Sequence, residues 1–247
     1  MKGKRPNLWS DESGAAMLEF TAAVFAFFTI LFGTLEFAQV YYEWNAATKA
    51  TQYGARLAAV SDPVAANLVT LTGTEPTGTL PGAQMPSFDC VCKFTSGTLG
   101  CTGSVPTGAA ACGIGATGTA AMNAIFYGRT SAGVAYTAAQ GCQAPGSSFQ
   151  VQNLGMCNYL DGLFNASGTN LTSQNLIVEY QYTGLGYAGR LGPTPTHTGG
   201  AVPTIIVSLT GVTYNFTLVG GLAGITSVTL PTFTTSVTGE DLAGGTG

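Results

Sequence analysis

The most constraining feature of the chain is an apolar run from Ala15 to Leu35, which holds a single ionisable residue, Glu19, in 21 positions. As a helix this run would span about 31 Å, close to the hydrocarbon thickness of a bilayer. Lys2, Lys4 and Arg5 precede the run, and no basic cluster follows it. We therefore expect a single membrane-spanning helix, with its N-terminus in the cytoplasm and the remaining chain outside.

A secretory signal peptide is the competing interpretation of this run. The apolar region of a signal peptide is usually about 7–15 residues long and is followed by a small-residue cleavage site. Here the run is longer, carries a carboxylate near its start, and continues without proline as far as Ala59. We expect one helix from about Ala15 to Ala59, membrane-embedded in its first half, that ends before Asp62-Pro63.

The second half of this helix has a weak apolar stripe at three- and four-residue spacings. The stripe consists of Phe37, Tyr41, Trp44, Thr48, Thr51 and Ala55. Polar residues such as Glu36 and Glu43 occupy the other faces. The pattern predicts an amphipathic helix with the stripe as its apolar face.

Glu19 needs an explanation, because a carboxylate at the centre of a bilayer costs about 3 kcal/mol on insertion scales. Near the cytoplasmic end the cost is smaller, since the side chain reaches the interface. One interpretation is an interfacial residue without a role. The other is that Glu19 pairs with a positive charge at the same depth. Cleavage after Gly14 would supply that charge as the new α-amino group of Ala15, four residues away.

The residues that carry a family resemblance lie in the same segment. Gly14 is followed five residues later by Glu19, then by Phe20 and the long apolar helix. This arrangement resembles the class III signal of type IV prepilins. The wider pattern also contains Gly33, Glu36 and Phe37, followed by Gly54-Ala55-Arg56. Over about residues 10–60 it resembles the TadE-like family of the tight-adherence (Tad, or Flp) pilus system.

The resemblance implies a minor pilin or pseudopilin of the Tad (type IVc) pilus. It implies cleavage between Gly14 and Ala15, and a role for Glu19 and Phe20 in subunit assembly. The implied partners are other pilins or pseudopilins of the same pilus, the prepilin peptidase, the inner-membrane assembly platform and membrane lipid. The implied location is the bacterial inner membrane, crossed once with the C-terminal domain in the periplasm, and then the pilus or cell surface.

The expected organisation has three parts: a leader (residues 1–14), a transmembrane and amphipathic helix (15–60) and an extracytoplasmic globular domain (61–247). In the last part we expect helices at 119–128 and 150–165, and strands at 175–183, 204–219 and 226–238, where β-branched and aromatic residues gather. We expect residues 80–119 to form loops that are cross-linked by disulfides. The predicted fold class is α+β, with an antiparallel β-sheet and short helices after the long helix.

Six cysteines follow the apolar run and none precedes it. They are Cys90, Cys92, Cys101, Cys112, Cys142 and Cys157. An even number in the exported part favours disulfides, which form in oxidising compartments. The alternative, a metal site, lacks CxxC spacing, and the only histidine, His197, is distant in sequence. The sequence does not choose among the possible pairings.

Composition and motifs exclude several functions. Charged residues make up 8% of the chain and its net charge is −4, whereas nucleic-acid binding needs clustered Lys and Arg. No catalytic motif appears, and His197 lies in a Gly/Thr/Pro-rich segment. We therefore expect no enzymatic activity, cofactor or metal. The competing function is a membrane-tethered surface adhesin or binding module.

Overall fold

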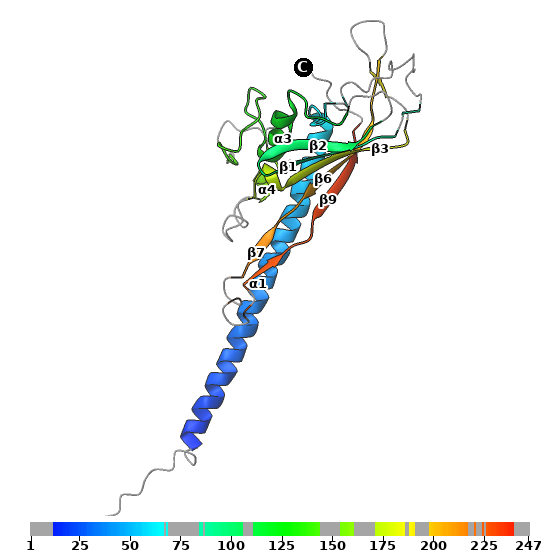
Figure 1. Ribbon diagram of the computed structural model, residues 1–247. Helices are drawn as coiled ribbons and strands as arrows, with labels where there is room; N and C mark the ends of the chain where they lie inside the picture. The colour runs from blue at the N-terminus through cyan, green and yellow to red at the C-terminus, as the bar shows by residue number, and fades with distance from the viewer. Residues whose placement is uncertain are drawn as a thin grey trace, which may run out of the picture. The chain divides into compact units, whose positions relative to one another are not determined.

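The computed structural model describes residues 12–66, 68, 84–85, 87–105, 111–143, 154–160, 171–185, 188–190, 198–216, 220, 224 and 226–239. A long helix comes first and is followed by an antiparallel sheet with short helices (Figure 1). This order confirms the predicted α+β class. The chain divides into two compact units, Met1–Tyr42 with Asn215–Val228, and Glu43–Tyr214 with Thr229–Gly247.

Helix α1 runs without a break from Glu12 to Val60. It contains no proline, and its residues are dominated by Ala, Leu, Phe and Thr. The helix ends just before Asp62-Pro63, where the proline disfavours helical geometry in the preceding residue. The expected long helix is therefore confirmed, and it continues from the apolar run into the second unit.

A five-stranded antiparallel sheet, in the order β2-β1-β3-β6-β9, forms the centre of the second unit. Its strands are β1 (Asp89–Thr95), β2 (Thr98–Ser104), β3 (Leu176–Tyr182), β6 (Pro203–Leu209) and β9 (Phe233–Thr238). Two small two-stranded sheets pair β4 (Ala188–Arg190) with β5 (Thr198–Gly200), and β7 (Thr213–Asn215) with β8 (Ser227–Thr229).

The hairpin of β1 and β2 corrects the expectation of loops over residues 80–119. Cys90 and Cys92 alternate with Val91 and Lys93 along β1, and the strand pairs with both β2 and β3. The connecting turn holds Ser96 and Gly97 at φ values of 50° and 81°. Positive φ at both central residues is the geometry of the tight turns that match the twist of a hairpin. The many glycines and cysteines obscured this two-residue turn signal.

Two predicted strands are each divided in the structure. The described part of the expected strand at 204–219 is β6 followed by β7, and Gly211 between them has a φ of 72°. Residues 217–219 lie outside the described residues. The expected strand at 226–238 is β8 followed by β9, and Pro231 lies in the break. Proline has no N–H to donate to a sheet, so it interrupts the ladder. The strand expected at 175–183 is confirmed as β3.

The short helices partly follow the expectation. Helix α3 (Gly118–Tyr127) confirms the prediction at 119–128, and Met122, Ile125 and Phe126 on it are buried. Helix α4 is described over Cys157–Leu160, within the expected 150–165, of which residues 150–153 and 161–165 lie outside the described residues. A short 3-10 turn, η3 (Ser173–Asn175), begins with a capping box on Thr172 and leads into β3.

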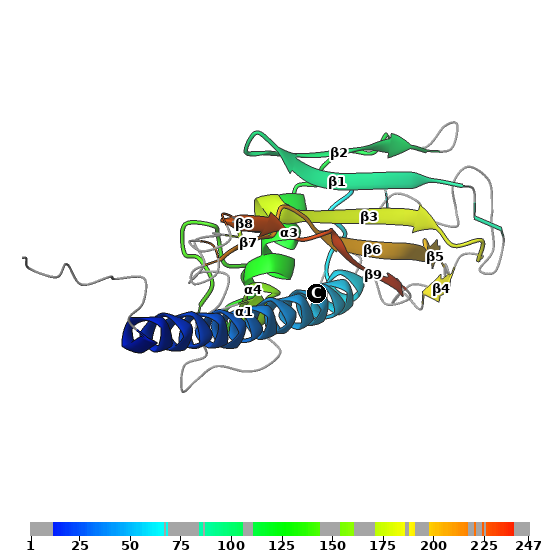
Figure 2. The ribbon, with the colours of Figure 1, turned by 90° about the horizontal axis from the view of Figure 1, so that it is seen from below.

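One face of the large sheet faces the core of the second unit. Along β3 and β6 alternate residues are buried, from Leu176 to Tyr180 and from Ile205 to Leu209. Tyr180 is fully buried, and its hydroxyl accepts a 3.0 Å hydrogen bond from the backbone N–H of Val64. Figure 2 shows α3, α4 and the end of α1 on the same side of this sheet. Burying this face supplies the core of the domain.

Candidate functional site

The first half of α1 is apolar and uncovered. Its most apolar 18-residue window has a mean hydropathy of 2.0, and none of that window is buried. A core helix of a soluble protein can be equally hydropathic but is mostly buried, whereas this part of α1 is not buried. This helix therefore fits a single-pass membrane anchor.

The hydroxyl groups of the three threonines in the apolar run are all hydrogen-bonded within the helix. The hydroxyls of Thr21, Thr29 and Thr34 each donate a 2.8 Å hydrogen bond to a carbonyl three or four residues earlier in α1. Hydrocarbon offers no hydrogen-bond partner, so polar groups within it have to be satisfied inside the protein. These threonines meet that requirement on their own helix.

The predicted processing and assembly residues lie at the start of this helix. Gly14 and Ala15 are in the first turn of α1, while residues 1–11 of the predicted leader lie outside the described residues. The side chains of Glu19 and Phe20 are exposed. Glu19 is therefore a carboxylate on an otherwise apolar, open surface. Its predicted pairing with the α-amino group of Ala15 stays a prediction.

The predicted apolar face of the second half of α1 is wrong at its aromatic positions. Phe37 and Tyr41 are 67% and 70% exposed, whereas Glu36 and Glu43 are each only 1% exposed. The inward stripe consists of Glu36, Val40, Glu43, Ala47, Ala50, Gly54 and Ala58, at helical spacing. Small side chains along this stripe let the helix lie close to its neighbours, whereas the rings of Phe37 and Tyr41 are on the outside.

Gly54 illustrates how close that approach is. A Cβ atom added at Gly54 would lie 2.3 Å from the sulfur and 2.6 Å from Cγ of Met156, the residue before α4. Nearby, the ring of Tyr53 lies against that of Tyr159, with centroids 4.9 Å apart. The glycine in the Gly54-Ala55-Arg56 motif is therefore explained by the packing of α1 on the α4 segment.

On the sheet side, α1 packs against the edge strand β9. The rings of Trp44 and Phe233 meet edge to face at a centroid distance of 4.9 Å. About two turns further along α1, the hydroxyls of Thr51 and Thr235 are hydrogen-bonded at 3.0 Å. These contacts hold the second half of α1 as part of the folded domain.

Glu43 was not singled out by the sequence analysis, and it is the least satisfied group on α1. Its Oε2 is buried and has no hydrogen-bond partner among the described residues. Burial raises the pKa of Glu43 from its ordinary value of 4.5 to about 7, because the low-dielectric surroundings disfavour the carboxylate. A glutamate at helical spacing among small residues was the available signal.

All six cysteines are paired, which confirms the expected disulfides and supplies the pairing that the sequence left open. Cys92–Cys101 joins opposite residues of the β1–β2 hairpin. Cys90–Cys112 ties β1 to the segment before α3, and Cys142–Cys157 ties the segment after α3 to α4. The bridges close loops of 9, 22 and 15 residues, so each restrains the unfolded chain.

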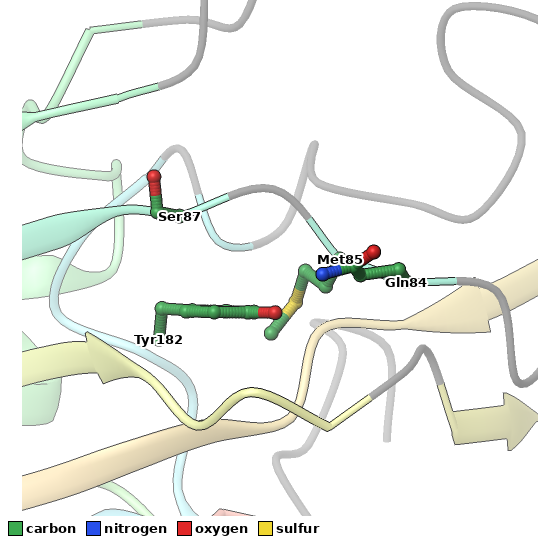
Figure 3. Close-up of a pocket in the computed structure, with 4 residues that line it drawn as sticks. All are labelled: Gln84, Met85, Ser87 and Tyr182. Carbon is green, nitrogen blue, oxygen red and sulfur yellow. The ribbon is translucent and has the colours of Figure 1, made fainter.

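A shallow hollow of about 370 Å³ opens beside the end of β3, lined by Gln84, Met85, Ser87 and Tyr182. Figure 3 shows the Tyr182 ring directed toward the sulfur of Met85. None of the described residues that line it is a histidine or carries a carboxylate. Within the described part of the chain, no group of three or more His, Cys, Asp or Glu side chains is placed to hold a metal ion. His197 lies outside the described residues.

Comparison with known proteins gives one finding. The family model described as TadE-like protein matches residues 14–56. The match covers the predicted processing motif, the apolar helix and the inward stripe as far as Arg56, which confirms the resemblance seen in the sequence. Searches of curated proteins and of solved structures found no match.

Proposed function

We propose that this chain, whose residues 14–56 are TadE-like, is a minor pilin or pseudopilin that helps to assemble or tip a Tad-type adherence pilus. The observation that carries the proposal is the family match together with the uncovered apolar helix at the same residues. The TadE-like family consists of pilus-associated structural proteins rather than enzymes. The match over residues 14–56 supports the coarse role, a pilin-like protein of the Tad system.

The continuity of α1 supports an anchor that stays attached to its domain. Ala47, Ala50 and Ala58 are buried in the second unit, and they belong to the same helix as the apolar run. Removal of the helix, as for a secretory signal, would take this inward stripe with it. We infer that membrane segment and domain function as one piece, as a pilin-type subunit requires.

The proposed topology places the basic N-terminus in the cytoplasm and the disulfide-bonded domain in the periplasm. Lys2, Lys4 and Arg5 support that orientation through the positive-inside rule. The three disulfides support it independently, because such bonds persist in oxidising compartments. We propose further that a prepilin peptidase cuts after Gly14, leaving Ala15 as the mature N-terminus.

Mass spectrometry of the protein isolated from peptidase-competent cells tests the processing step. We expect Ala15 as the N-terminus, and in peptidase-deficient cells a chain that begins at Met1. Gly14→Leu adds a side chain at the cleavage site and should leave the leader attached. Ser13→Ala, at the neighbouring position, is the matched control and should still be cleaved. A protein that still begins at Met1 in peptidase-competent cells would refute the proposed processing.

The competing function is a surface adhesin, for which the hollow beside Tyr182 offers a small polar and apolar lining. Deletion of the gene separates the two functions. A pilus component should be required for pili on the cell surface, whereas an adhesin should be required only for attachment. Normal pili with lost attachment would favour the adhesin, and purified filaments would then show whether the chain is a minor or a major subunit.

A further inference from the structure

The exposed surface of α1 is free of charge over a longer distance than the apolar run. Between Phe20 and Thr48 the only charged residues are Glu36 and Glu43, and both are buried in the protein. The next charged residue, Lys49, is exposed. This uncharged surface covers 29 positions, or about 43 Å of helix, compared with about 30 Å of hydrocarbon and about 40–45 Å for the bilayer with its headgroups.

Aromatic side chains gather at the outer end of this surface. Phe37, Tyr41, Tyr42 and Trp44 are all exposed, and Trp44 retains 39% exposure although one side of its ring meets Phe233. These residues begin two positions beyond the apolar run, which itself spans the hydrocarbon. Tyr and Trp favour this depth, because the ring body is apolar and the hydroxyl or N–H reaches water and headgroups.

A second segment belongs to the same compact unit as the membrane helix. Asn215–Val228 is grouped with Met1–Tyr42 and contains no charged residue. Its sequence, NFTLVGGLAGITSV, is rich in Leu, Val, Ile and Gly. The backbone N–H of Phe216 donates to the carbonyl of Thr226 at 3.0 Å, so the two ends of the segment lie side by side. Val228 is exposed to 38%.

We infer that the headgroup layer of the outer leaflet contacts two surfaces: the aromatic residues of α1 from Phe37 to Trp44, and the paired ends of the second segment, where Val228 is exposed. The partner is a lipid surface. Three observations favour lipid: the aromatic surface continues directly from the membrane span, its length matches a whole bilayer, and both acids along it are turned into the protein. A membrane would exclude exposed carboxylates at this depth.

The inference rests on the membrane insertion in the proposed function, and quenching of tryptophan by brominated phosphatidylcholine tests it. The full chain with Trp9→Phe keeps Trp44 as its only tryptophan. In vesicles, bromine placed near the headgroup end of the acyl chains should quench Trp44 at least about twofold more than bromine near the methyl end, as expected for an indole in the interfacial layer.

The segment is tested in a background with Trp9→Phe and Trp44→Phe. The indole of Val228→Trp should show the same preference for shallow bromine. Val134→Trp is the matched control, because Val134 is 64% exposed and lies in the other unit, in a turn after α3. The indole of Val134→Trp should not be quenched by either brominated lipid. Near-ultraviolet circular dichroism and intact disulfides confirm that each variant is folded.

Three outcomes would overturn the inference or its premise. If the chain floats with the vesicles but Trp44 and the Val228→Trp indole behave like the control, lipid does not contact these surfaces. If their quenching falls as protein is added at constant lipid, a second copy of the chain covers them instead. If the chain does not float with the vesicles at all, the membrane anchor of the proposed function fails.

Discussion

The buried carboxylate of Glu43 makes the stability of the domain depend on pH. In the folded protein burial holds its pKa at about 7, whereas in the unfolded chain it returns to about 4.5. Between these values the folded state binds the proton that the unfolded state has released. Raising the pH through this window therefore destabilises the fold.

The size of the effect follows from the two pKa values. Each pH unit between them is worth about 1.4 kcal/mol, so the free energy of unfolding falls by about 3 kcal/mol from pH 4.5 to pH 7 and changes little above that. For a domain of this size about 3 kcal/mol corresponds to about 6–12 °C in melting temperature. Glu43→Gln removes the titration but keeps the shape and polarity of the neutral acid.

The assay is thermal unfolding of the full chain in detergent micelles, with Trp9→Phe in every variant. Trp44 fluorescence then reports on its contact with Phe233. At pH 4.5 the parent and Glu43→Gln should melt at similar temperatures. At pH 8 the melting temperature of the parent should be about 6–12 °C below that of Glu43→Gln. Glu179→Gln, which replaces a half-buried carboxylate that Gln181 hydrogen-bonds, should keep the slope of the parent. A constant difference between parent and Glu43→Gln at both pH values would refute the reasoning.

Two further predictions concern α1. Gly54→Val should lower stability by about 1–3 kcal/mol, because its side chain would overlap Met156, whereas Gly100→Ala on β2, with open space around it, should not; the same melting assay measures both. Glu19→Ala should leave membrane insertion intact, since it makes the segment more apolar, but should abolish pili if the carboxylate registers subunits. Normal pili in Glu19→Ala cells would leave Glu19 as an interfacial residue without a role in assembly.

Much of the fold was predictable wherever one kind of residue dominated a segment. The long helix and β3 followed from an apolar run without proline and from a cluster of β-branched and aromatic residues. The β1–β2 hairpin was missed, because Cys90 and Cys92 were read for their sulfur chemistry rather than as alternate, inward residues of a strand. Disulfide pairing could not be predicted, since it depends on which strands are neighbours in three dimensions.

The face of α1 was misjudged for a physical reason that also bears on its function. Large aromatic residues usually point into a protein, because water is the alternative. Beside a membrane the alternative is lipid, so the outward orientation of Phe37 and Tyr41 carries no hydrophobic free-energy cost there. A carboxylate that points outward there has a large cost, and Glu36 and Glu43 are both buried in the protein. Among the described residues, Oε2 of Glu43 has no hydrogen-bond partner. Small residues such as Ala47 are buried instead and form the contact between α1 and the rest of the domain. The exposed rings of Phe37 and Tyr41 and the buried side chain of Glu43, whose pKa is raised by burial within the protein, both agree with the proposed lipid contact of α1 beyond its apolar run.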